Sequence, residues 1–293
     1  MPLNCIFEFM NKVKIIECPR DAMQGIKSHF ISTEAKAAYI NSLLKVGFDT
    51  IDFGSFVSPK AIPQMRDTAA VLSKLDISQT QSKLLAIIAN VRGANDAAQF
   101  EEIDYLGYPF SISENFQMRN THKTIHQSIE ALEEILSIAI RTNKEVVAYL
   151  SMGFGNPYGD PWNVEIVGEW TEKLSNMGIK IISLSDTIGS STPDVIEYLF
   201  SNLIPSYPNI EFGAHLHTTS DSWHEKVNAA YNAGCHRFDG AIKGYGGCPM
   251  AKDELTGNMP TEKLLSYFTA QKAITGIKPM SFESAYNKAL QIF

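Results

Sequence analysis

The segment KIISLSDTIGSSTPDVIEYLF, residues 180–200, contains a strand, a polar loop and the start of a helix. Residues 180–186 carry three apolar side chains and end at Asp186, where a short loop begins. Thr192 followed by Pro193 is typical of a helix N-terminus, because a threonine side chain caps the first turn and proline fits its first position. A strand joined to a helix by a short loop is the repeating unit of parallel sheets.

The same unit recurs along the chain. We expect helices between successive strands, two further helices after the last one, and the other strands at 13–17, 50–56, 83–89, 102–110, 145–152, 210–217 and 237–244. Continuous apolar strands with helical crossovers indicate a parallel sheet that is covered on its faces. Eight such units without a linker predict an α/β fold of one domain over 1–293, a (β/α)8 TIM barrel with extra C-terminal helices.

An open, doubly wound sheet is the alternative architecture for this pattern. Its nucleotide-binding version usually carries a glycine-rich phosphate loop after the first strand. Neither G-x-G-x-x-G nor a Walker loop follows residues 13–17, which argues against that version.

Composition limits the function classes. The 293 residues are 44% apolar and carry a net charge of -7, which argues against a nucleic-acid or anionic-membrane partner. No run approaches the roughly 18 apolar residues of a membrane span. The first residues lack a basic, apolar signal segment. The cysteines, Cys5, Cys18, Cys235 and Cys248, form no C-x-x-C pair. We therefore expect a cytoplasmic protein with free thiols.

In a barrel of this kind, function resides where strands end and loops begin. The first strand ends in ECPRDAMQ, which brings Glu17, Arg20 and Asp21 together. A carboxylate can bind a metal, and a guanidinium can neutralise a developing oxyanion. The alternative is an ordinary surface ion pair, which stabilises a protein little.

The predicted strand 210–217 ends in HLH. His215 and His217 are two positions apart, so within a strand both rings point to the same face. Two imidazoles on one face are a natural pair of metal ligands. The alternative is a pair of buried core histidines.

Two further strand ends carry acidic residues. Asp186 could orient a ligand or water from the outer shell of a site, or could cap the next helix. Asp52 begins the segment DFGSFVSPKAIPQM, in which Lys60 offers positive charge to an anionic tail. An ordinary surface loop is the alternative for this segment.

The last strand is followed by GYGGCPMAKDELTGN, residues 244–258. Its glycines allow positive φ angles and a close approach to a ligand. Cys248 is its one thiol, and Asn258 could give a carbonyl oxygen to a hard cation. A carboxylate, two imidazoles and an amide form a mixed oxygen and nitrogen set. That set suits Mg²⁺ or Mn²⁺, with Zn²⁺ also compatible.

These residues together resemble the 3-hydroxy-3-methylglutaryl-CoA lyase family, which belongs to a superfamily of metal-dependent TIM-barrel lyases. The matching text is VKIIECPRDAMQ, SFVSPKAIPQM, SLSDTIGSSTP, HLH and GYGGCPMAKDELTGN, and the resemblance spans about residues 12–290. It implies that the metal ligands are Asp21, His215, His217 and Asn258. It further implies that Arg20 stabilises an enolate, that Cys248 transfers a proton, and that the surrounding polar shell comprises Glu17, Asp52 and Asp186.

The reaction implied by the resemblance is a retro-Claisen cleavage of 3-hydroxy-3-methylglutaryl-CoA to acetoacetate and acetyl-CoA. The implied partner is thus a small acyl-CoA substrate, and the family suggests a homo-oligomer, a dimer or larger. Residues that contact CoA are not assigned, although Lys60 and residues 91–93 are candidates.

Six positions depart from the family pattern. Cys18 and Ala22 stand where glycine is usual, Asp52 where glutamate is usual, Thr218 where aspartate is usual, and Met152 and Asn156 where cysteines are often found. Two alternatives therefore stay open. One is a diverged aldolase or synthase acting on another acyl-CoA or 2-oxo acid. The other is a barrel that binds a metal without turnover.

Overall fold

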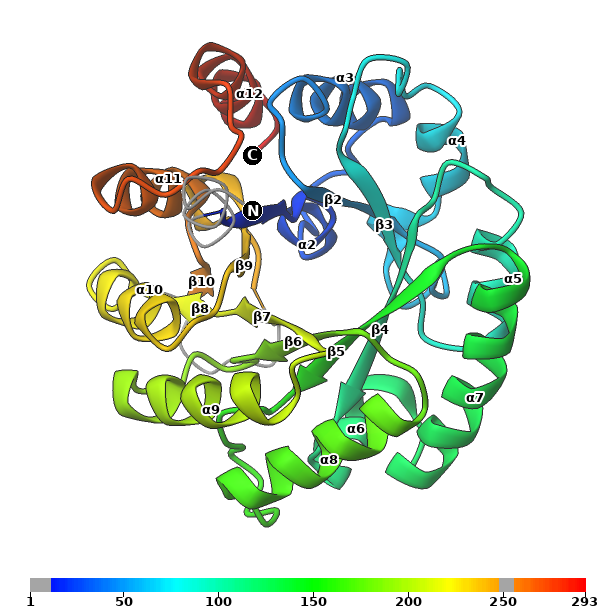
Figure 1. Ribbon diagram of the computed structural model, residues 1–293. Coiled ribbons are helices and arrows are strands. Elements are labelled where there is room, and N and C mark those ends of the chain that lie inside the picture. Colours follow the sequence, from blue (N-terminus) through cyan, green and yellow to red (C-terminus); the bar gives the residue numbers. More distant parts are fainter. Residues whose placement is uncertain (1–11, 248–255) are drawn as a thin grey trace, which may run out of the picture.

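The computed structural model describes residues 12–247 and 256–293; Cys5 and Cys248 lie outside the described residues. Its centre is a closed barrel of parallel strands (Figure 1). In order around the barrel these are β1 (Lys14–Glu17), β2 (Thr50–Ser55), β3 (Lys83–Ile87), β4 (Tyr105–Ser111), β5 (Glu145–Ser151), β6 (Ile181–Ser185), β7 (Glu211–His215) and β9 (Arg237–Gly240). β1 pairs with both β2 and β9, which closes the ring and confirms the predicted (β/α)8 fold.

Helices surround the barrel. They are α2 (Pro19–Gln24), α3 (Thr33–Leu43), α4 (Thr68–Leu72), α5 (Val91–Ala97), α6 (Glu114–Thr121), α7 (Ile125–Arg141), α8 (Val164–Asn176), α9 (Pro193–Ser206), α10 (Trp223–Asn232), α11 (Thr261–Ala270) and α12 (Pro279–Ile292). The hydroxyl of Thr192 accepts a hydrogen bond from the Val195 amide, as its predicted role as the cap of α9 requires. The extra C-terminal helices are α11 and α12, and α12 lies next to α3 (Figure 1). Within the described part of the chain, no helix combines the length and apolar character that a bilayer span needs.

The predicted strand 210–217 is interrupted. β7 ends at His215, and β8 (His217–Thr218) pairs instead with β10 (Gly257–Asn258), antiparallel and outside the barrel. The reason is the backbone at Leu216, whose carbonyl accepts the Met259 amide at 3.1 Å and so turns the chain toward β10. The expectation of one continuous strand carrying both histidines was therefore wrong.

The predicted strand 237–244 is also shorter than expected. It ends at Gly240, and a 3-10 turn follows at η2 (Ile242–Gly244). Gly244 has a φ of +68°, and a Cβ there would lie 2.8 Å from the Asn258 carbonyl oxygen. Glycine at 244 therefore allows the turn and the close approach of β10.

The inside of the barrel has two different sides. One side is an apolar cluster formed by Leu85, Ile87, Val147, Tyr149 and Ile181. The ring of Tyr149 meets the ring of His215 edge to face at 5.6 Å, which places the cluster directly beside the polar residues. The other side is polar, and it comprises the buried residues Arg20, Asp52, Arg237 and Asp239 together with the half-buried His215.

Candidate active site

Asp21, His215 and His217 meet at the mouth of the barrel, although they come from α2, β7 and β8. Their potential ligand atoms all lie within 4.8 Å of one another. The Nδ1 atom of His217 lies 3.1 Å from the Thr187 carbonyl oxygen. Because a carbonyl can only accept, Nδ1 carries the proton and Nε2 keeps a lone pair.

The Nε2 atom of His217 is the clearest sign that this group fits a metal ion. It is buried, and among the described residues it has no hydrogen-bond partner. A buried polar atom without a partner is costly unless a ligand satisfies it. Burial lowers the pKa of His217 to about 4, and the neighbouring His215 adds to this. His217 is therefore neutral near pH 7, as a metal ligand must be.

His215 is oriented from the opposite side. Its Nδ1 lies 2.9 Å from Oδ2 of Asp239, a carboxylate buried on β9. Such a carboxylate fixes the ring and directs the other nitrogen toward the ligand position. Burial alone would lower the pKa of His215, but the bond to Asp239 outweighs it and the pKa is raised.

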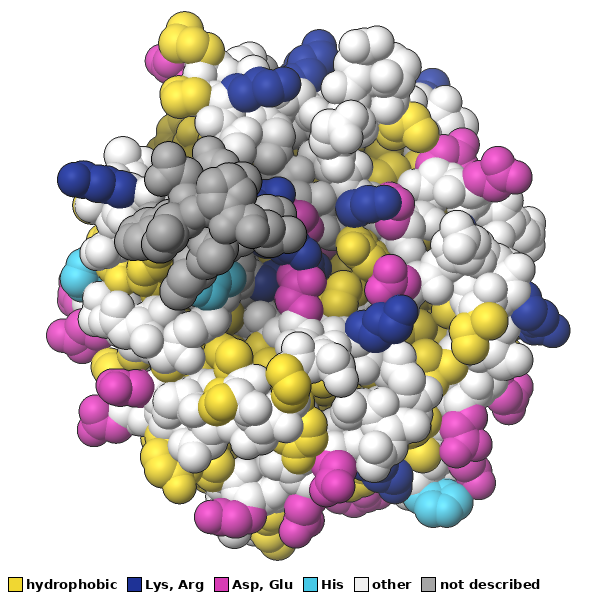
Figure 2. Space-filling view, in the orientation of Figure 1, with side chains coloured by type: hydrophobic (Ala, Val, Ile, Leu, Met, Phe, Trp, Pro, Cys, Tyr) yellow, Lys and Arg dark blue, Asp and Glu magenta, His cyan; other side chains and the backbone are white. Residues whose placement is uncertain are grey.

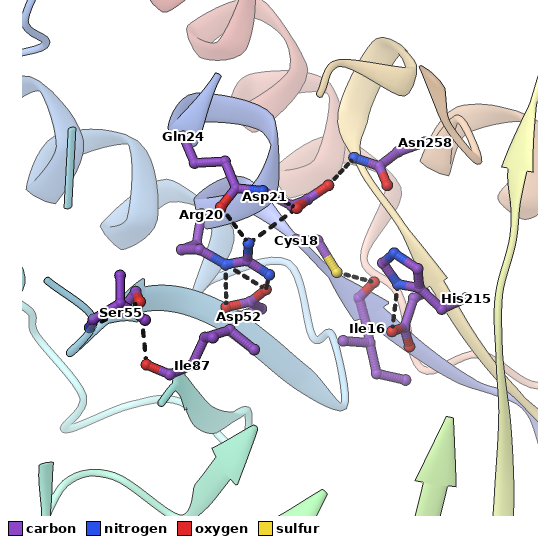
Figure 3. Close-up of polar contacts among 12 residues, drawn as sticks. Ile16, Cys18, Arg20, Asp21, Gln24, Asp52, Ser55, Ile87, His215 and Asn258 are labelled. Atoms are coloured by element: carbon purple, nitrogen blue, oxygen red, sulfur yellow. Dashed lines mark hydrogen bonds and ion pairs between the residues drawn. The ribbon is translucent and has the colours of Figure 1, made fainter. Parts of the chain in front are cut away.

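Arg20 joins the two carboxylates of the site (Figure 3). Its Nε and Nη2 donate to Asp52 at 3.0 and 2.5 Å, and its Nη1 donates to Asp21 at 2.9 Å. Burial favours the neutral acid at Asp21, yet the Arg20 charge outweighs it and lowers the pKa of Asp21 to about 2. At Asp52 burial dominates and raises the pKa to about 6. Although Asp52 is shorter than the glutamate usual at this position, both of its carboxylate oxygens accept hydrogen bonds from Arg20.

Asn258 reaches the site through the backbone. β10 pairs Asn258 directly with His217, which brings its side chain to Asp21. The amide Nδ2 donates to Asp21 at 2.6 Å and to the Tyr245 carbonyl at 2.8 Å. Coordination by Asn258 therefore requires its amide to turn so that Oδ1 faces the ligand position.

Glu17 is not brought together with these residues. It faces the outside of the barrel wall, where it accepts the Ile242 amide at 2.9 Å and the Thr261 hydroxyl at 2.6 Å. Burial raises the pKa of Glu17 to about 8, so it holds a proton at neutral pH. Its contacts support η2 and α11, the two elements that flank residues 245–260.

Asp186 lies behind His217. Its carboxylate accepts hydrogen bonds from the Ser191 hydroxyl at 2.5 Å and from the ammonium of Lys226 at 2.7 Å. Lys226 also donates to the His217 carbonyl at 2.9 Å. Asp186 thus positions the backbone of a ligand and does not itself join the ligand atoms.

Sequence reasoning missed Asp239 and Lys226. Asp239 had a usable signal, because it is a carboxylate near the end of a predicted barrel strand, where functional residues are expected. Lys226 had none, since one lysine in an amphipathic helix usually lies at the surface, whereas this one is buried. Cys248 lies outside the described residues, so its predicted role stays a prediction.

Comparisons with known proteins identify the family of this chain. The HMGL-like family model matches residues 12–288. The chain belongs to the HMGL-like family. A hydroxymethylglutaryl-CoA lyase of Bacillus subtilis is 32% identical over 271 residues, which are 92% of this chain and 89% of that protein. A cytoplasmic 3-hydroxy-3-methylglutaryl-CoA lyase of Rattus norvegicus is 31% identical over 268 residues, or 90% and 76% of the two chains.

Solved structures give the same relationship. An HMG-CoA lyase from Acinetobacter baumannii, solved with coenzyme A and 3-methylmalate, is 28% identical and superposes with a TM-score of 0.88. The match covers 97% of this chain and 92% of that one. The family expected from the motifs of this HMGL-like chain is thereby confirmed.

Proposed function

We propose that this chain is a divalent-metal-dependent carbon–carbon lyase that cleaves 3-hydroxy-3-methylglutaryl-CoA into acetoacetate and acetyl-CoA. The observation that carries the proposal is the convergence of Asp21, His215 and the unpartnered His217 Nε2 within 4.8 Å, next to Arg20. The relatives that share this fold over most of their length are named for that activity.

Mg²⁺ or Mn²⁺ is the proposed ion, with Zn²⁺ as a further candidate, because the ligand set mixes oxygen and nitrogen. Asp21, His215 and His217 would hold it, with Asn258 as the fourth ligand after its amide turns. When bound, a divalent ion supplies Lewis acidity that polarises the oxygens of the substrate.

Arg20 is the proposed stabiliser of the enolate. Its guanidinium is fixed by Asp52 and Asp21, so it needs little reorganisation when negative charge develops beside it. Asp52 would act by holding this orientation. Cys248 is the proposed proton donor to the enolate carbon, and Glu17 and Asp186 would position the elements that carry the ligands.

The acyl-CoA tail is proposed to leave the site beside the end of β2. A cavity of about 380 Å³ opens there, lined by apolar side chains such as Phe56 and Phe100 and by the cations Arg66 and Arg92. This lining suits a ligand that carries both an apolar arm and phosphates. Arg92 also belongs to the segment 91–93 that the sequence singled out.

The remaining proposals concern the whole protein. We propose a cytoplasmic homo-oligomer, a dimer or larger, that needs neither a nucleic acid nor a membrane. The cytoplasmic rat relative and the net charge of -7 support this. Light scattering of the purified protein tests the oligomeric state. Fractionation of cells that express the protein with a C-terminal tag tests its location.

The deciding experiment measures acetoacetate release from 3-hydroxy-3-methylglutaryl-CoA by metal-free protein to which Mn²⁺ or Mg²⁺ is added back. We expect turnover with the ion and none after chelation. His217→Gln should abolish it, whereas His126→Gln, at an exposed histidine on α7, should not. Absence of turnover by the folded, metal-loaded wild type would contradict the proposal, and a panel of other acyl-CoA and 2-oxo acid substrates would then identify a diverged aldolase.

A further inference from the structure

Cys18 places a thiol beside the candidate active site. It follows β1 directly and turns inward, and its sulfur, one nitrogen of His215 and one oxygen of Asp239 all lie within 4.8 Å of one another. Cys18 is 1% exposed and Asp239 is 3% exposed. The sulfur lies 3.9 Å from the Ile16 carbonyl oxygen, a contact drawn as a dashed line in Figure 3. A thiol contact of that length is weak.

Asp239 supplies an independent sign of a ligand. Its Oδ2 bonds to His215, but its Oδ1 is buried and finds no hydrogen-bond partner in the described ranges 12–247 and 256–293. A buried carboxylate oxygen without a partner is rare and costly, and a cation would satisfy it.

The charges around Cys18 favour a cation. Its sulfur lies in the field of three carboxylates, those of Asp239, Asp52 and Asp21, against the guanidinium of Arg20. The charge of Arg237 also acts on Asp239 and opposes a cation. These groups together carry three negative charges and two positive ones, and His215, with 13% of its side chain exposed, is more exposed than Cys18 or Asp239.

We propose that Cys18, His215 and Asp239 form a second metal subsite, which takes a thiophilic divalent ion such as Zn²⁺ or Cd²⁺ and shares His215 with Asp21 and His217. Sulfur, imidazole nitrogen and carboxylate oxygen are a ligand set for these ions and not for Mg²⁺. On binding, the thiol proton of Cys18 leaves to solvent and the sulfur binds as thiolate.

The two subsites exclude each other. The His215 nitrogen that faces Asp239 is Nδ1, so an ion in the second subsite takes Nδ1 and leaves the ring proton on Nε2. Nε2 then has no lone pair for an ion held by Asp21 and His217. A thiophilic ion is therefore an inhibitor that competes with Mg²⁺ or Mn²⁺, a property that rests on the proposed lyase function.

The test of the subsite measures metal binding and does not depend on enzyme activity. Metal-free full-length protein is titrated with Cd²⁺ while the ultraviolet sulfur-to-metal charge-transfer absorption is recorded. We expect the band to saturate at one equivalent in the wild type and to be lost in Cys18→Ser. Asp239→Asn should weaken binding about tenfold or more, as removal of a ligand or its support does.

Two matched thiols serve as controls. Cys235→Ser removes a buried thiol that contacts the Phe212 and Arg237 carbonyls, away from the site. Cys248→Ser removes the thiol of the loop. The band should persist in both. A band that survives Cys18→Ser, or that vanishes in Cys248→Ser, overturns the proposal; Cys18→Ala repeats the test if the serine variant does not fold by circular dichroism.

A second measurement separates this inference from the proposed function. In the Mn²⁺-supported lyase assay, Cys18→Ser should raise the Zn²⁺ concentration for half inhibition about tenfold. An unchanged inhibition curve contradicts the competition between subsites. If the wild type shows no lyase turnover, the proposed function fails, and the Cd²⁺ band still decides whether the thiol subsite exists.

Discussion

The two sides of the barrel interior are built on different principles. On the side of β3 to β6, Leu85, Val147 and Ile181 form an apolar wall that packs without charge. On the side of β1, β2, β7 and β9, most buried charges have a partner, as Arg20 with Asp52 and His215 with Asp239. Buried charges need such partners because an unpaired one is expensive. The polar side therefore fixes geometry, whereas the apolar side supplies stability.

The largest expected effect tests whether the polar side depends on pairing. Lys226→Met leaves the buried Asp186 without its ion-pair partner, which should lower the free energy of unfolding by about 3–5 kcal/mol. Urea unfolding followed by circular dichroism measures it. The double variant Lys226→Met, Asp186→Asn should recover part of the loss, and a loss equal to that of the single variant would show that pairing is not the cause.

Arg20→Gln tests whether the polar side carries the chemistry. Loss of a preorganised cation at a developing oxyanion should lower kcat about 10²–10³-fold. Steady-state assays of acetoacetate release measure it, with Arg141→Gln on the exposed end of α7 as the control. Equal activity in the two variants would remove Arg20 from the mechanism.

The pH dependence of stability linked to Glu17 tests whether the buried polar groups extend through the barrel wall. Its pKa is raised from 4.5 to about 8, so the folded protein holds a proton that the unfolded chain loses. The stability linked to this proton is complete below about pH 4.5 and is lost as pH rises toward 8.

Glu17→Gln keeps a neutral side chain at every pH. At pH 8 the substitution should raise the free energy of unfolding by roughly 2 kcal/mol, a gain limited because the amide retains only part of the hydrogen bonding. At pH 5 the free energy of unfolding should change little. Thermal melts of both proteins at the two pH values measure it. A difference that does not depend on pH would contradict a protonated Glu17.

The smallest effect is on the apolar side. Ile181→Val removes one buried methylene from the wall and should cost about 1 kcal/mol of stability. The kcat per folded molecule should stay unchanged, because Ile181 pairs with no charge. A drop in kcat would show that the apolar wall also positions the site, so that the two sides would not differ in this respect.

The sequence was sufficient where the signal was local. Apolar runs and caps such as Thr192–Pro193 predicted the barrel strands and helices, because each depends on neighbours in the chain. Arg20, Asp21, His215 and His217 were predicted as one candidate site because barrel strands deliver their ends to one place, and the structure brings these four residues together.

What could not be predicted depends on distant parts of the chain. Glu17 and Cys18 are adjacent, so only one can face inward, and the contacts of Ile242 and Thr261 with Glu17 decide which. The turn at Leu216 requires Met259 as a partner. The burial of Lys226 requires Asp186, on a different βα unit.

The pairing of β8 with β10 has a consequence for how this protein can change over evolution. Asn258 lies opposite His217 through the backbone pairing of the two strands. A shift of one residue within β10 itself would turn Asn258 to the other face. An insertion or deletion inside either strand is therefore excluded during evolution, because it would move the asparagine away from the second histidine.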